Sequence, residues 1–80
     1  MSCRLFYREG CHLCEDMINQ LHELFPDLDF QLLNVDARPE WFEDYNDRVP
    51  VLTCGNLILS QYYLEPEKIR KYFNGQSAAL

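Results

Sequence analysis

The spacing of apolar residues changes twice in the first half of this chain, and that change limits the folds available to it. A short apolar run at residues 5–7 precedes a polar break at residues 8–10. Apolar residues then recur mostly at steps of three and four, which is typical of one face of an amphipathic helix. These residues are Leu13, Met17, Leu21, Leu24 and Phe25. Apolar and polar residues alternate again over residues 28–35, so the pattern predicts a strand, a helix and a second strand.

Local signals set the expected limits of this first helix. Glu15 and Asp16 lie in its first turn, where the positive end of the helix dipole favours acidic side chains. Pro26 cannot continue a helix and disfavours helical angles at the residue before it. We therefore expect the helix to begin at Cys11 and to end at Phe25.

A short helix and a β-hairpin are expected next. Pro39 suits the first turn of a helix, and three aromatic residues follow it within two turns. These are Trp41, Phe42 and Tyr45. Residues 49–54 and 57–59 are apolar runs separated by a Gly-Asn turn, which predicts two antiparallel strands.

The last predicted element is a helix that Pro66 opens. Its inward face is expected to carry Ile69, Tyr72 and Phe73. Gly75 is a suitable residue to cap and end it. Residues 76–80 are therefore expected to form a frayed tail.

The elements give an α/β fold in the order β-α-β-α-β-β-α. A helical crossover joins parallel strands and a hairpin joins antiparallel ones, so we expect a mixed four-stranded sheet with three helices. Eighty residues allow one domain, which we place at residues 1–75. Such a domain buries only about 60% of its unfolded surface, so most aromatic residues are expected in the core.

Composition excludes several classes of protein. The chain is 48% hydrophobic, which argues against disorder, and its formal charge of −6 disfavours nucleic acid as a partner. It has no run of about 18 apolar residues that would span a membrane. Residues 1–8 do not resemble a signal peptide, so we expect a cytoplasmic protein. We also expect it to be a monomer. The four cysteines are then not expected to form a disulfide framework, and Cys3 and Cys54 are expected to pack as small buried hydrophobic residues, with Cys54 as a candidate regulatory thiol.

The sequence Cys11-His12-Leu13-Cys14 lies at the predicted strand-to-helix junction. Side chains three residues apart at a helix start project to the same side, which lets two sulfur atoms bond. Unpaired N–H groups and the helix dipole favour the thiolate form of the first cysteine. Cys14 lies one turn further in, where it is better placed to resolve a mixed disulfide than to begin one.

Three segments of the chain resemble the glutaredoxin family, with thioredoxins as wider relatives. They are residues 6–14, which contain the C-x-x-C pair, residues 34–36 (Asn-Val-Asp) and residues 48–51 (Arg-Val-Pro-Val). The likeness extends from Leu5 to about Phe73 in the order and length of the elements. It implies a thioredoxin-like fold and a thiol–disulfide oxidoreductase with Cys11 as nucleophile and Cys14 as resolving thiol.

The resemblance also implies a substrate site around the two cysteines. Pro50 matches the family's cis-proline, and the backbone of Val49 would pair with a bound substrate. Arg8 stands where glutaredoxins usually carry a lysine that contacts a carboxylate of glutathione. His12 and Leu13 replace the family's usual Pro-Tyr, and Arg48 replaces its threonine; we include all three among the candidate substrate-binding residues. Ser60-Gln61 and Tyr62-Tyr63 stand where the family has Gly-Gly and an aspartate.

The implied partners are protein disulfides or glutathionylated proteins. No tightly bound cofactor is implied, glutathione is a possible co-substrate, and the reductant would be glutathione or a thioredoxin reductase-like protein. A zinc site is not expected, because one C-x-x-C pair supplies half of the ligands and the chain has no second pair.

Alternatives remain open at this point. Two copies of Cys11 with two glutathione molecules hold an iron–sulfur cluster in some members of the resembled family, so a cluster carrier is one alternative. A redox-silent binding module that only keeps the fold is another. His12 either tunes Cys11 or is an exposed loop residue, and Arg8 and Arg48 either bind substrate or only solvate an acidic surface.

Overall fold

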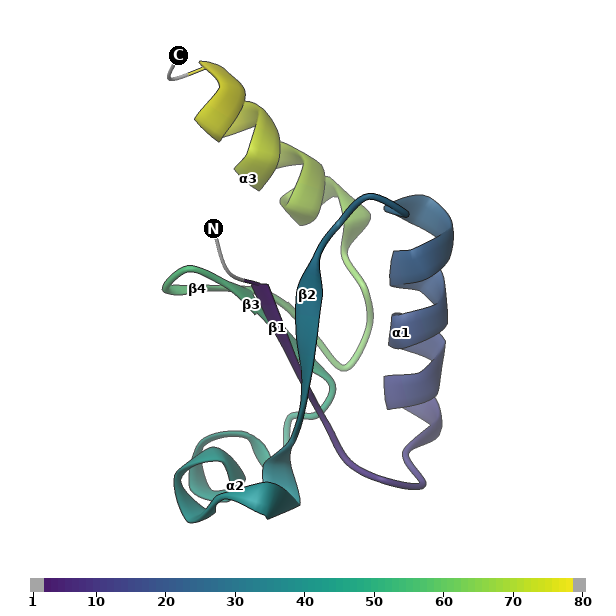
Figure 1. Ribbon diagram of the computed structural model, residues 1–80, viewed down its shortest axis with the longest axis vertical. Coiled ribbons are helices and arrows are strands. Elements are labelled where there is room, and N and C mark those ends of the chain that lie inside the picture. Colours follow the sequence, from purple (N-terminus) through teal and green to yellow (C-terminus); the bar gives the residue numbers. More distant parts are fainter. Residues whose placement is uncertain (1–2, 79–80) are drawn as a thin grey trace.

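A four-stranded sheet in the order β2-β1-β3-β4 forms the centre of the protein, seen in a computed structural model that describes residues 3–78 (Figure 1). The strands are β1 (Cys3–Tyr7), β2 (Phe30–Asn34), β3 (Val51–Cys54) and β4 (Leu57–Gln61). The helices are α1 (His12–Leu24), α2 (Pro39–Tyr45) and α3 (Pro66–Ala78), and a short 3-10 helix, η1 (Val35–Ala37), follows β2. The predicted order and the mixed four-stranded sheet with three helices are confirmed.

Strand pairing determines which loops meet. β1 is parallel to β2, with Tyr7 opposite Asn34, and antiparallel to β3, with Phe6 opposite Val51. The C-terminal ends of β1 and β2 and the start of β3 therefore lie at the same end of the sheet. The loop that carries Cys11 leaves the sheet at this end (Figure 1).

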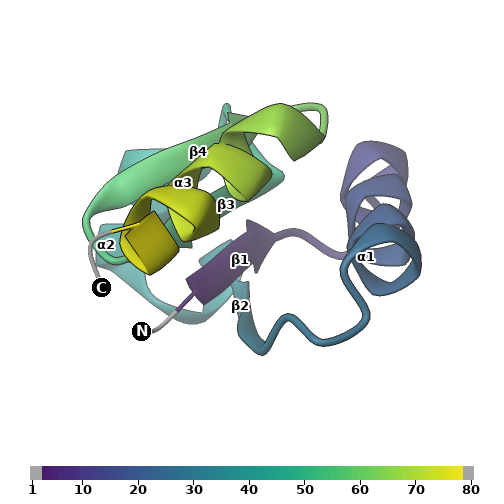
Figure 2. The same cartoon turned by 90° about the horizontal axis from the view of Figure 1, so that it is seen from above.

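Helices cover both faces of the sheet. On one face, α1 and α3 pack over a core of eight buried residues (Figure 2). These are Cys3, Leu5, Met17, Leu21, Leu52, Cys54, Leu59 and Ile69. On the other face, α2 packs over Phe6, whose ring stacks on Tyr45 at 4.3 Å between centroids and meets Trp41 edge-on at 5.8 Å. Burying these apolar side chains is the main stabilising contribution to such a fold.

Several apolar residues assigned to buried patterns are exposed, among them Phe42, Leu57 and Ile58. Leu32 is 48% exposed because β2 is an edge strand, shorter than the predicted residues 28–35. Leu24 is 47% exposed in the last turn of α1, where it borders a hollow between that turn and α3. Cys14 belongs to the buried face of α1 instead.

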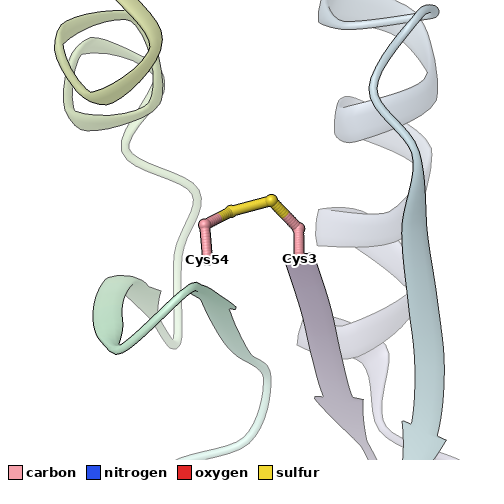
Figure 3. Close-up of a disulfide and its surroundings, with 2 residues drawn as sticks. All are labelled: Cys3 and Cys54. Atoms are coloured by element: carbon pink, nitrogen blue, oxygen red, sulfur yellow. A yellow bond between two sulfur atoms is a disulfide. The ribbon is translucent and has the colours of Figure 1, made fainter. Parts of the chain in front are cut away.

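Cys3 and Cys54 are buried as predicted, but the expectation that they are separate thiols is wrong, and Cys54 is not available as a free regulatory thiol. They form a disulfide across β1 and β3, shown in Figure 3. The antiparallel register places the two residues directly opposite each other, with 4.0 Å between their Cα atoms. The sequence pattern identified both strands but not their register, and the two cysteines are 51 positions apart in the chain. A single disulfide is not the framework that the sequence argued against, but it is a pairing that the sequence did not predict.

The last helix continues further than predicted. Gly75 does not end α3, which runs to Ala78, so residues 76–78 are helical rather than a frayed tail. Glycine costs about 1 kcal/mol relative to alanine inside a helix, which is too little to stop a helix by itself. The predicted tail at residues 79–80 lies outside the described residues. In the described range, no helix has the length and apolar character needed to cross a membrane.

Candidate active site

Cys11 occupies the N-cap position of α1. Its backbone is extended (φ −92°, ψ 111°), and its sulfur accepts a hydrogen bond from the backbone N–H of Cys14, with 3.2 Å between Sγ and N. The backbone N–H of Cys11 donates to the carbonyl of Arg8 at 3.3 Å. These contacts fix a partly exposed sulfur above the first turn of the helix, in the field of its free N–H groups.

Gly10 makes the turn that brings the chain from β1 to Cys11. Its φ of +76° lies in the left-handed region that glycine adopts without a steric penalty. A Cβ atom at this position would meet no other atom within 4 Å, so only the backbone conformation favours glycine here. The placement of Cys11 therefore depends on a local backbone requirement.

Cys14 is the second free thiol, and it is 1% exposed. The pKa of Cys14 is raised from 9.0 to about 12, chiefly by burial and next by a hydrogen bond between its side chain and Cys11. A backbone hydrogen bond and the positive charge of Arg8 act in the opposite direction on this pKa. Cys14 is therefore held as a neutral thiol while Cys11 is free.

The peptide bond between Val49 and Pro50 is cis, as the family resemblance implied. Pro50 is buried and directly precedes β3, so it lies at the end of the sheet where β1 leads to Cys11. The carbonyl of Pro50 accepts a hydrogen bond from the N–H of Tyr62 at 3.0 Å. The side chain of Val49 is partly exposed and packs against the core under α2.

Tyr62 was not among the predicted site residues. It has a φ of 66°, which is unusual for a residue with a side chain, and its hydroxyl donates to the carbonyl of Asp47 at 2.8 Å. Tyr62 and Tyr63 are 45% and 69% exposed, so they lie on the surface after β4.

Both candidate anion-binding arginines contact acidic residues of the chain. Arg8 forms an ion pair with Asp36, with 3.2 Å between its closest nitrogen and oxygen. Arg48 lies 4.0 Å from a carboxylate oxygen of Asp47, and both side chains are exposed. The structure therefore places each guanidinium next to a carboxylate of the same chain.

His12 and Leu13 fill the two positions between the cysteines. His12 is exposed, whereas Leu13 is partly buried. Asp36 is the residue that sequence reasoning missed as a neighbour of the site. The parallel pairing of Tyr7 with Asn34 is the signal that could have found it, because it brings the next residues of both strands together.

Metal-ligating side chains do not gather in the described part of the chain. Across residues 3–78, no three His, Cys, Asp or Glu side chains form a group that could hold a metal ion.

The chain matches known proteins over most of its length. Residues 2–74 match the family described as glutaredoxin-like domain (DUF836). No curated protein matches the chain. Protein Ne2328 from Nitrosomonas europaea, a solution NMR structure, is 37% identical, with 89% of this chain and 88% of that chain covered and a TM-score of 0.77.

Two further solved structures share the fold. The glutaredoxin-like protein NrdH-redoxin from Escherichia coli is 25% identical, with 89% of this chain and 93% of that chain covered and a TM-score of 0.68. Thioredoxin 1 from Thermosipho africanus is 17% identical, with 96% of this chain and 99% of that chain covered and a TM-score of 0.61. With the family match at residues 2–74, these findings show that the chain belongs to the glutaredoxin-like domain family and has a thioredoxin-like fold.

Proposed function

We propose that this protein is a thiol–disulfide oxidoreductase that works by a dithiol mechanism, with Cys11 as the attacking thiol and Cys14 as the resolving thiol. The observation that carries the proposal is the position of the Cys11 sulfur at the N-cap of α1, where it accepts the N–H of Cys14. A thiolate is the nucleophile in disulfide exchange, and a helix N-terminus favours the anion.

The proposed reaction transfers two electrons from the dithiol to a substrate disulfide. The Cys11 thiolate attacks one sulfur of that disulfide, the substrate S–S bond breaks, and the departing thiolate takes up a proton. Cys14 then loses its proton and attacks the sulfur of Cys11. The second substrate thiol leaves, and the protein is left with a Cys11–Cys14 disulfide.

The contacts of Cys14 support this order of events. Two of the influences that raise the pKa of Cys14 come from Cys11, its hydrogen bond and its charge. Both are removed when the Cys11 sulfur is bonded to a substrate, while the opposing influences of Arg8 remain. The pKa of Cys14 is then lower in the mixed disulfide than in the free dithiol, while burial, the largest cause of the shift, still raises it.

Protein disulfides are the proposed substrates. The solved structure of NrdH-redoxin is described as explaining the thioredoxin-like activity profile of that glutaredoxin-like protein. This chain carries Tyr62 and Tyr63 where the glutaredoxin family has residues that close over glutathione, and both are exposed. The oxidised pair is proposed to be returned to the dithiol by glutathione or by the redox-active thiols of a thioredoxin reductase-like protein.

Trapping of the mixed disulfide tests the proposal. With reduced Cys14→Ser protein and insulin as the disulfide substrate, we expect a covalent adduct at Cys11 that dithiothreitol releases. The Cys11→Ser variant, which keeps Cys14, is the matched control and should form no adduct. Equal adduct formation by both variants, or adducts on neither, would contradict the assigned roles.

A further inference from the structure

We propose that Asp36 is a specificity-determining residue: by occupying the guanidinium of Arg8, it disfavours disulfide substrates that carry a carboxylate close to the reacting sulfur. This inference rests on the proposed redox function. It names neutral or basic disulfide-bearing peptides as the preferred substrate class.

The contact between Arg8 and Asp36 uses two guanidinium nitrogens and both carboxylate oxygens. Nε of Arg8 donates to Oδ2 at 3.3 Å, and an Nη atom donates to Oδ1 at 3.2 Å. This fork is the geometry with which arginine binds a carboxylate of a ligand. An incoming carboxylate must therefore replace Asp36 or bind to the remaining N–H groups.

Other contacts hold the two side chains in this arrangement. The N–H of Asp36 donates to the side chain of Asn34 at 2.9 Å, which fixes the turn after β2. The guanidinium of Arg8 lies over the ring of Phe42, with 5.3 Å to its centroid. Side chains of Arg8 and Asp36 are 35% and 50% exposed, so the pair lies at the surface where a substrate could reach it.

Arg8 is also connected to the reacting cysteine. Its carbonyl accepts the N–H of Cys11 at 3.3 Å, and its charge acts on Cys14. It is thus the cation placed to meet an anionic group next to the reacting sulfur.

Apart from Arg8, the charged residues that flank the two cysteines in the sequence are negative. Glu9 precedes Cys11 by two positions, and Glu15 and Asp16 follow in the first turns of α1; all three side chains are exposed. With Arg8 neutralised by Asp36, this local excess of carboxylates repels anionic substrates and attracts basic ones. The effect on affinity is moderate, because partly exposed pairs are screened by water and salt.

Binding of S-methylglutathione tests the inference without any redox step. This probe carries two carboxylates and cannot exchange disulfides, so its dissociation constant can be measured by NMR titration of the isotope-labelled, reduced protein. We expect Asp36→Asn to lower the dissociation constant about 2- to 5-fold, which matches the usual strength of an exposed ion pair. Asparagine keeps the size of the side chain and removes its charge.

Two controls separate a local effect from a general one. Asp29→Asn removes the same charge beyond the opposite end of β2 and should leave the dissociation constant within error of the wild type. Adding Arg8→Gln to Asp36→Asn should abolish the gain. Unchanged or undetectable binding by Asp36→Asn overturns the inference, and so does an equal gain in Asp29→Asn or a gain that persists without Arg8.

The inference and the proposed function fail in different experiments. If S-methylglutathione binding follows the expected pattern but insulin forms no adduct at Cys11, the redox function is rejected while the role of Asp36 at Arg8 stands. If the adduct forms but the titration shows no effect of Asp36, only the inference is rejected.

Discussion

Cys3 and Cys54 are joined across neighbouring antiparallel strands, at the end of β1 that is opposite to the end leading to Cys11. The free pair, Cys11 and Cys14, lies in the loop and helix that follow the other end. Both half-cystines are buried, at 2% and 0% exposure, whereas Cys11 is partly exposed. The protein therefore separates a disulfide-bonded cysteine pair in its core from a free pair at the start of α1, of which Cys11 is partly exposed and Cys14 is buried.

The buried disulfide is expected to stabilise the fold by about 2–4 kcal/mol, because it closes a long loop in the unfolded chain. The comparison needs the Cys11→Ser/Cys14→Ser background, in which the remaining pair is the only source of a disulfide. Urea unfolding of this variant, oxidised and reduced, should give a lower free energy of unfolding for the reduced form. Identical unfolding midpoints, with the oxidation states verified by alkylation and mass, would contradict a stabilising disulfide.

Gly10 should be sensitive to substitution although no atom lies near it. Gly10→Ala is expected to lower the free energy of unfolding by about 1 kcal/mol, because alanine disfavours the positive φ at this position. Gly10→Asn is the matched comparison and should cost less, since asparagine tolerates the left-handed region better. Thermal or urea unfolding measures both. Equal stability of Gly10→Ala and wild type would show that the turn relaxes to another conformation.

The raised pKa of Cys14 predicts a pH-dependent stability of the reduced protein. Between pH about 9 and about 12, the unfolded chain releases the Cys14 proton while the folded protein keeps it. Stability contributed by this group is therefore complete below pH 9 and is lost as pH rises, by at most about 1.4 kcal/mol per pH unit.

Cys14→Ser supplies the reference for that measurement, because it removes this titration and leaves the tyrosines and lysines unchanged. The difference in free energy of unfolding between reduced wild type and Cys14→Ser should be constant from pH 7 to 9 and should shrink above pH 9. A difference that stays constant up to pH 11 would mean that Cys14 titrates alike in both states.

Local sequence signals predicted the order of the elements well. Each of these signals acts within a few residues of the structure that it specifies. They are the apolar spacing from Leu13 to Phe25, the prolines at positions 26, 39 and 66, and the Gly-Asn turn. The limits of the elements were less accurate, as at Gly75, where a helix continues through a residue that suits a cap. Boundaries depend on small differences in free energy that tertiary contacts can reverse.

The apolar pattern of the sequence did not predict the contacts between residues that lie far apart in the chain. The disulfide of Cys3 with Cys54 depends on the register of β1 with β3, and the pair of Arg8 with Asp36 depends on that of β1 with β2. Register follows from packing of whole strands rather than from local propensity. The C-x-x-C motif was recognisable because both of its residues lie in a single turn of helix.

The central claim is tested most directly by alkylation of the reduced, folded protein with iodoacetamide. The rate of reaction is measured for each free cysteine. The position of modification is read by peptide mass spectrometry from pH 6 to 10. We expect Cys11 to be alkylated first throughout this range, while Cys14, buried and with a pKa of about 12, stays unmodified. Equal rates at the two positions, or modification of Cys14 before Cys11, would contradict the assignment of Cys11 as the attacking thiol.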